Sequence, residues 1–225
     1  MKKLFLFFMI IVLSSLIFSN KIYVDNSKFK NYISKLNSVE YVDEVEEANL
    51  VFYNGIINNI ENERAYDYTV GIEDIIYLDN REINEYFIYS LNNYKKIIRN
   101  ITKIFKIYLP KYSTKYDRVL KKEIKKINNL IGSVDKKDVL ILKRGKKYDY
   151  LLREFNIKHI DVDKYFVYKE KAYRKYGLRK IYLFKEFQKQ YVNQLKNYGY
   201  SFERIESQKN YPYFLIEIVR KIKNG

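Results

Sequence analysis

The chain has 225 residues, no Cys, a single His and a formal net charge of +16. The lack of Cys excludes disulfides, thiolate metal sites and thiol nucleophiles, and a lone His159 leaves almost no room for a His-rich metal cage or a His-dependent relay. The positive residues are dispersed over predicted helix faces and form no recognisable nucleic-acid-binding module, so we predict no nucleic-acid partner.

Residues 1–19 have the layout of a secretory signal peptide. Two lysines precede an apolar run from Leu4 to Phe18, and charge resumes at Lys21. This run is slightly short for a membrane anchor, which is the alternative interpretation. We expect cleavage near Ser19 and an exported mature chain in the periplasm or at the cell exterior.

Residues 20–81 indicate an N-terminal α/β lobe. Lys21–Asp25 alternates as a short strand does, and Ser27–Leu36 has the apolar spacing of a short helix. Asn49–Tyr53 is a continuous apolar run, which is typical of a strand buried on both faces of a parallel sheet.

Residues 82–132 predict two long helices that meet at Pro110. Proline cannot donate a backbone hydrogen bond inside a helix, so it ends the first helix or opens the turn to the second. Ser113 or Thr114 could cap the second helix, and Gly132 follows its last turn. Apolar residues recur at steps of three and four along the first helix, at Ile83, Phe87, Leu91, Tyr94, Ile98, Ile101, Phe105 and Tyr108.

Residues 133–225 restart the alternation of strands and helices and indicate a C-terminal lobe. The predicted strands are Asp138–Leu142, Ile157–Val162, Lys180–Phe184 and Ser201–Ile205. The whole pattern predicts an α/β protein with two doubly wound lobes joined by a long central helix.

No catalytic site is visible in the sequence. The seven glycines form no phosphate-binding loop, and no Gly-x-Ser-x-Gly elbow is present. Asp161 and Asp163 project to one strand face, but no base partner accompanies them. We therefore predict that the protein is not an enzyme and has no catalytic residues.

Several segments resemble the zinc/manganese solute-binding proteins of bacterial ABC transporters, a family that includes adhesin-like lipoproteins. Ala48–Gly55 (ANLVFYNG) resembles the family's "ADLIFYNG", Tyr77–Asn80 resembles "WLDP", and Phe202–Glu206 falls at "VVVLDPL". The resemblance implies a metal-type periplasmic binding protein fold and an exported substrate-binding role. It also implies an ABC permease partner, contact with the membrane only through that transporter, and a monomer.

The expected metal ligands are mostly missing. Members of this family usually hold the metal with three His and one carboxylate. The first His has no counterpart, the second falls at Ile75, and the third falls at Gly145. Glu206 is the carboxylate that survives, with Glu203 as its neighbour if the alignment shifts. Because zinc needs about four N, O or S donors, we expect binding of zinc or manganese to be weak or absent.

Positive residues replace the third ligand segment. Arg144, Lys146 and Lys147 are expected to line the cleft, where they would repel a divalent cation and favour an anion, although a solvated loop is the plainer interpretation. His159 does not fall at a family ligand position. The alternative function is a non-transport periplasmic or surface interaction protein on the same fold, which would use its Tyr-rich basic surface as the contact.

Overall fold

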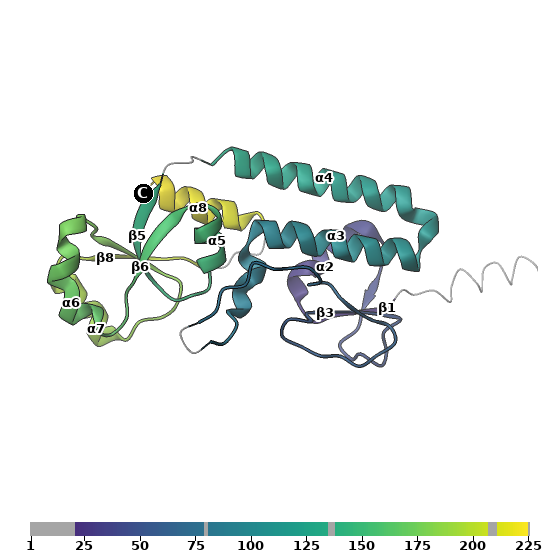
Figure 1. Cartoon of the computed structure of the whole chain (residues 1–225), viewed down its shortest axis with the longest axis horizontal. Helices are drawn as coiled ribbons and strands as arrows, with labels where there is room; N and C mark the ends of the chain where they lie inside the picture. Colours follow the sequence, from purple (N-terminus) through teal and green to yellow (C-terminus); the bar gives the residue numbers. More distant parts are fainter. Residues whose placement is uncertain (1–20, 79–80, 135–137, 207–210, 225) are drawn as a thin grey trace, which may run out of the picture. The chain divides into compact units, whose positions relative to one another are not determined.

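The computed structural model describes residues 21–78, 81–134, 138–206 and 211–224, so the predicted signal peptide lies outside it. The described chain is mixed α/β, with two four-stranded parallel sheets and the helices α2 to α8 (Figure 1). It divides into two compact units, one of residues up to Gly71 with Ile97–Lys121, and the other of Ile72–Lys96 with Lys122–Gly225. Among the described helices, none is both long and apolar enough to cross a membrane.

The first unit contains a sheet of short strands in the order β2-β1-β3-β4. The strands are β1 (Lys21–Val24), β2 (Glu40–Tyr41), β3 (Leu50–Tyr53) and β4 (Ala65–Asp67). The predicted buried strand is confirmed at β3, where Leu50, Val51 and Phe52 are all shielded from solvent. β2 and β4 have no apolar run, because they lie at the two edges of the sheet, and the sequence pattern missed both.

Aromatic and aliphatic side chains form the core of the first unit. The 3-10 helix η1 (Ser27–Phe29) leads into α2 (Lys30–Leu36). The ring of Phe105 stacks on Phe52 with 5.6 Å between the centroids. The hydroxyls of Tyr32 and Thr102 lie 2.6 Å apart in the same interior, so the buried phenol keeps a hydrogen bond.

The central segment forms two helices, α3 (Leu91–Tyr108) and α4 (Ser113–Gly132), with a 3-10 turn, η3 (Pro110–Tyr112), between them. The predicted break at Pro110 is confirmed. The start of the first helix was predicted about eight residues too early, since η2 (Glu85–Tyr89) precedes α3 and Ile83 is partly exposed. The Ser113 hydroxyl donates to the carbonyl of Pro110 instead of accepting from α4, so it is not the predicted N-cap.

The second unit contains the other sheet, in the order β6-β5-β7-β8. Its strands are β5 (Val139–Arg144), β6 (Ile157–Asp161), β7 (Lys180–Leu183) and β8 (Ser201–Arg204). All four were predicted, β5 and β7 from apolar runs and β6 and β8 from their place in the alternation of strands and helices. β5 continues two residues beyond its predicted end, because the charge of Lys143 is satisfied inside the protein.

Helices cover this sheet: α5 (Asp149–Glu154), α6 (Phe166–Tyr173), α7 (Lys189–Asn197) and α8 (Phe214–Asn224) (Figure 1). Leu142, Phe166, Ile181 and Leu195 belong to one buried apolar cluster between strands and helices. Because every strand runs in the same direction, the carboxyl ends meet at one edge, which is where ligands bind in open α/β sheets.

Candidate functional site

A pocket of about 890 Å³ lies at the carboxyl ends of β5, β6 and β7. Its wall contains four cationic and four anionic side chains. These are Arg144, Lys146, Lys147 and Lys185, and Glu82, Glu85, Asp161 and Asp163. The three residues predicted to line the cleft, Arg144, Lys146 and Lys147, all belong to this wall. The expected preference for an anion stays a prediction, because the wall contains as many acidic side chains as basic ones.

Two of the predicted cations are held in local contacts. The Lys146 ammonium lies 3.1 Å from a carboxylate oxygen of Asp161. The Lys147 ammonium lies 5.5 Å from the ring centroids of both Tyr89 and Tyr148. Burial of this amine lowers the pKa of Lys147 from its ordinary value. Neither side chain is a freely solvated charge.

Arg144 has an unused hydrogen-bond donor. It ends β5, and its guanidinium lies 5.0 Å from the centroid of the Phe187 ring. Its Nε is buried and has no hydrogen-bond partner among the described residues. An arginine with a free donor at a pocket wall suits a carboxylate or phosphate group.

Gly145 has a backbone conformation that disfavours any side chain. Its φ angle is +100°, in the region that glycine tolerates and other residues rarely adopt. A Cβ built there would lie 2.8 Å from the Cβ of Lys185 and 3.1 Å from its backbone nitrogen. The position where the resemblance expects a metal-binding His therefore has neither a donor nor room for one.

The other expected ligand positions are Ile75 and Glu206. Ile75 is half-buried in the loop before η2 and offers only an alkyl side chain. The Glu206 side chain is 75% exposed and lies 3.8 Å from the Arg204 guanidinium. Its neighbour Glu203 pairs with Lys221 at 2.7 Å, and this hydrogen bond lowers the pKa of Glu203.

A buried charge cluster, which no sequence pattern indicated, includes Asp161 of the pocket wall. The Lys143 ammonium is fully buried and lies 2.7 Å from carboxylate oxygens of both Asp149 and Asp161. It also donates to the carbonyl oxygen of Gly145 at 3.1 Å. Two carboxylates and a carbonyl are groups that a hard metal ion prefers. Here the lysine already neutralises them.

The charge cluster changes the pKa values of Asp161 and of the nearby His159. Burial opposes ionisation of Asp161, but hydrogen bonds and charges from Lys143 and Lys146 outweigh burial and hold its pKa below the ordinary value. Burial, together with the charge of Lys143, lowers the pKa of His159. His159 Nδ1 is buried and has no hydrogen-bond partner among the described residues. The imidazole is therefore neutral near pH 7.

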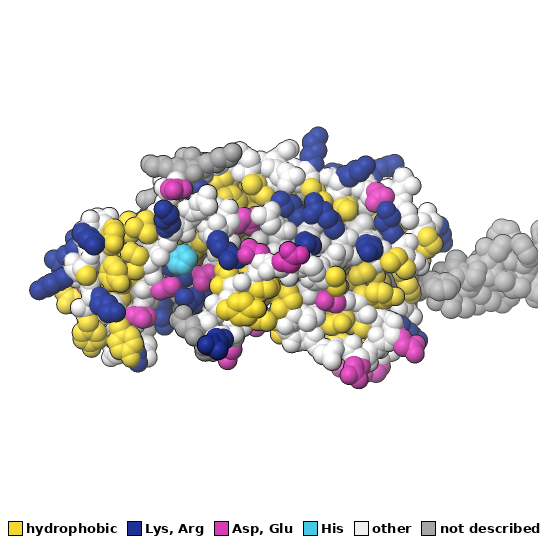
Figure 2. Space-filling view, in the orientation of Figure 1, with side chains coloured by type: hydrophobic (Ala, Val, Ile, Leu, Met, Phe, Trp, Pro, Cys, Tyr) yellow, Lys and Arg dark blue, Asp and Glu magenta, His cyan; other side chains and the backbone are white. Residues whose placement is uncertain are grey.

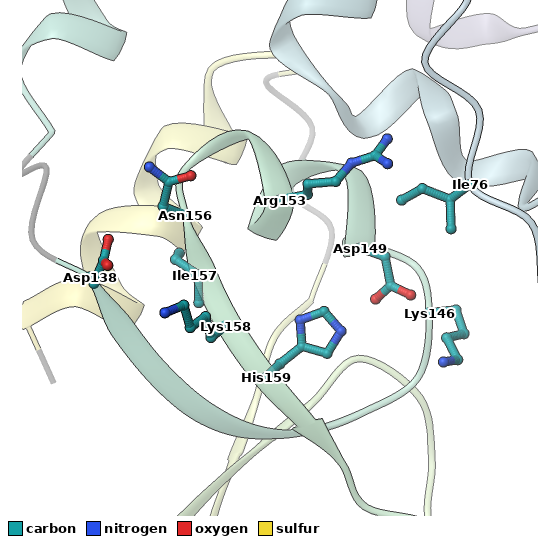
Figure 3. A pocket seen from close by; sticks show the side chains of 9 residues that line it. All are labelled: Ile76, Asp138, Lys146, Asp149, Arg153, Asn156, Ile157, Lys158 and His159. Carbon is teal, nitrogen blue, oxygen red and sulfur yellow. The ribbon is translucent and has the colours of Figure 1, made fainter.

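A second pocket, of about 810 Å³, is lined by Asp149 of this cluster and shares Lys146 with the first pocket. Figure 3 shows Asp149, His159 and Lys146 gathered on one side of it, with Asp138 and Asn156 on the other. His159 was expected to be an ordinary strand residue, and it does lie in β6. Its half-buried place beside Asp149 was not predictable, because these two residues come from separate elements.

Comparison with solved structures identifies the fold of this chain. No known family model and no curated protein matches the chain. The Cd-bound periplasmic metal binding protein from Candidatus Liberibacter asiaticus matches with a TM-score of 0.64 at 16% identity, over 91% of this chain and 97% of its own. Its Mn-bound form gives 0.63 and 18% over the same shares. An FpvC mutant from Pseudomonas aeruginosa gives 0.65 at 14% identity, over 91% and 100%.

The chain has the fold of the periplasmic metal-binding proteins. On this fold, the described residues contain no group of three or more His, Asp or Glu that could hold a metal ion. On this fold the expected ligand positions are occupied by Ile75, by Gly145 and by the solvent-exposed Glu206, and the first two offer no donor side chain.

Proposed function

We propose that this protein is an exported solute-binding protein of a zinc/manganese-type ABC transporter whose metal site is degenerate. In this proposal the two units are the lobes of a binding protein, joined through the central helices. The supporting observation is a pocket at the carboxyl edge of a parallel sheet, on a fold shared with proteins solved in Cd- and Mn-bound forms. The division of the mature chain into an N-terminal lobe (20–81), linking helices (82–132) and a C-terminal lobe (133–225) stays a prediction.

Acidic residues are present near the pocket, but two of the positions where the resembled family has its metal ligands lack donor side chains. Gly145 has no space for a donor side chain, and Ile75 replaces a donor with an alkyl group. Two nearby carboxylates, Asp149 and Asp161, are already paired with Lys143. A divalent cation would have to displace a buried ammonium to use them, which opposes tight binding.

The positive charge of Arg144 at the pocket wall favours an anionic group on any solute that enters the 890 Å³ pocket. The proposed partner is an ABC permease, and the protein would contact the membrane through that transporter. We also propose that the protein is a monomer and that it binds no nucleic acid. The proposed location is the periplasm or the cell exterior, as the predicted signal peptide implies.

Metal titration tests this proposal directly. We expect calorimetry of the metal-stripped mature chain to show zinc and manganese binding at least about a thousandfold weaker than in an intact member of the resembled family, or ~4 kcal/mol less favourable. The physical reason is that one exposed carboxylate, Glu206, cannot compete with water for the metal. Metal content of the protein as purified is a second readout.

Glu206→Ala is the informative variant, and Glu186→Ala is its matched control, because both carboxylates are exposed and pair with Arg204. Submicromolar zinc affinity that disappears in Glu206→Ala and survives in Glu186→Ala would show that an intact site exists. Weak or absent binding in all three proteins supports the degenerate site.

The alternative function, a periplasmic or surface interaction protein, is favoured by a specific surface. Exposed tyrosines and lysines gather on α6 and the turn after it. A permease and ATPase pair encoded beside this gene supports transport, whereas recovery of a non-transporter partner in cross-linking supports the alternative.

A further inference from the structure

The segment 164–180, which includes α6 and the 3-10 turn η4 (Arg174–Tyr176), is strongly basic. It contains seven Lys or Arg residues and a single acid, Glu170. We call its outward surface the basic tyrosine face and define it by Tyr165, Tyr168, Tyr176, Lys169, Lys171 and Lys175. All six side chains belong to exposed residues.

Glu170 does not neutralise this face, because it points into the protein. Its side chain is 2% exposed and accepts a hydrogen bond from Arg174 Nε at 2.7 Å. The Tyr200 hydroxyl donates to the same carboxylate at 3.2 Å. The buried acid therefore anchors the segment from within. Lys169, Lys171 and Lys175 form no ion pair within the part of the chain that the structure describes.

The tyrosines of the face are unusually exposed. Tyr168 is 83% exposed, Tyr165 55% and Tyr176 46%. The Lys175 ammonium lies 5.2 Å from the Tyr176 ring, so charges and rings alternate over a short distance. Figure 2 shows hydrophobic side chains next to Lys and Arg on the part of the second unit where Figure 1 places α6 and α7.

We propose that the basic tyrosine face docks on an anionic phospholipid surface. Tyrosine is favoured at the interface between lipid and water, since its ring enters the headgroup region and its hydroxyl stays hydrated. Lysines beside it are attracted to anionic headgroups within about a Debye length. The proposed contact is with the lipid surface itself, so it is distinct from contact through a transporter. Tyr165, at one end of the face, lies next to Arg144 and Asp163 of the pocket wall.

Vesicle co-sedimentation tests the proposal with the full mature chain. We expect binding to vesicles of pure phosphatidylglycerol and none to vesicles of pure phosphatidylcholine. The variant Lys169→Glu/Lys171→Glu/Lys175→Glu should bind phosphatidylglycerol at least about tenfold more weakly. Tyr168→Ser, which leaves the charge unchanged, should also weaken binding because it removes an interfacial ring.

A matched control separates this face from the general basicity of the chain. Lys121, Lys122 and Lys125 are exposed on α4, and their replacement by Glu changes the net charge by the same amount. We expect this control to stay within about twofold of the wild type. Circular dichroism would check that both triple variants are folded.

Three results would overturn the proposal: no sedimentation of the wild type with phosphatidylglycerol, equal losses in the two triple variants, or unchanged binding of Tyr168→Ser. Binding to an acidic protein or to DNA in place of vesicles would also overturn it. None of these results depends on metal or solute binding, so this inference and the proposed function fail separately.

Discussion

At the residue scale, Lys143 shows how a charged side chain can belong to the core. Its ammonium reaches two carboxylates and a carbonyl oxygen, and its residue lies inside the sheet, between β6 and β7. A buried ion needs such compensation, because an unpaired charge in the interior is very costly. Lys143 thereby fixes the relative positions of β5, β6 and the start of α5.

We predict that Lys143→Ala lowers the free energy of unfolding by about 3–5 kcal/mol, since it leaves Asp149 buried beside Asp161 without a cation. Urea denaturation of the mature chain would measure the change. Lys158→Ala is the control, because Lys158 is exposed on the neighbouring strand, and it should change stability by no more than about 0.5 kcal/mol. A loss below about 1 kcal/mol for Lys143→Ala would contradict a structural role for the cluster.

At the element scale, a distant carboxylate explains where α3 begins. The carboxylate of Glu154, at the end of α5, accepts hydrogen bonds from the Ser90 hydroxyl at 3.0 Å and from the backbone nitrogens of Leu91 and Asn92 at 2.8 and 3.1 Å. The first N–H groups of a helix have no partner within the helix, and a negative charge there also complements the helix dipole. This cap replaces the expected start near Ile83.

We predict that Glu154→Ala lowers the free energy of unfolding by about 1–2 kcal/mol, the usual effect of losing an N-cap, and that Glu154→Gln lowers it less because an acceptor oxygen remains. Chemical denaturation near pH 7 would measure both. Glu73→Ala, at an exposed site, is the control. Equal losses for the alanine and glutamine variants would argue against a capping role.

Glu154 also affects how the stability of the protein depends on pH. Burial raises the pKa of Glu154 above its ordinary 4.5, although hydrogen bonds from Ser90 and Leu91 oppose the shift. The folded state then binds the proton more tightly than the unfolded state, so wild-type stability relative to Glu154→Gln should rise as the pH falls through the folded pKa toward 4.5.

At the scale of the whole molecule, α3 and α4 contribute residues to both compact units. Ile98 is fully buried in α3, and its carbonyl accepts a hydrogen bond from the Thr102 hydroxyl at 2.7 Å. A break in α3 at Ile98 therefore disturbs a helix that contributes residues to both units.

We predict that Ile98→Pro costs about 3 kcal/mol or more and lowers hydrogen-exchange protection in both units together, because proline removes a helix hydrogen bond and clashes with the preceding turn. Ile98→Val, which removes one methyl group, should cost only about 1 kcal/mol and leave the protection pattern unchanged. Full protection of either unit in the proline variant would show that the units fold independently.

The sequence by itself determined most of the regular elements and the loss of the expected ligands. Apolar runs located β3, β5 and β7, and the break at Pro110 was visible because proline has a local effect on its own helix. Ile75 and Gly145 could be recognised as positions without a donor, because the identity of a side chain needs no structure to be read.

The tertiary structure decided what the charged residues do. Lys143 and Asp161 are 18 residues apart, and Glu154 is 63 residues from Leu91, so no periodic pattern relates either pair. The same holds for the acidic and basic side chains of the pocket wall, four of each sign, which come from several segments. Periodicity records which face of an element is buried, whereas ion pairing depends on which elements the fold brings together.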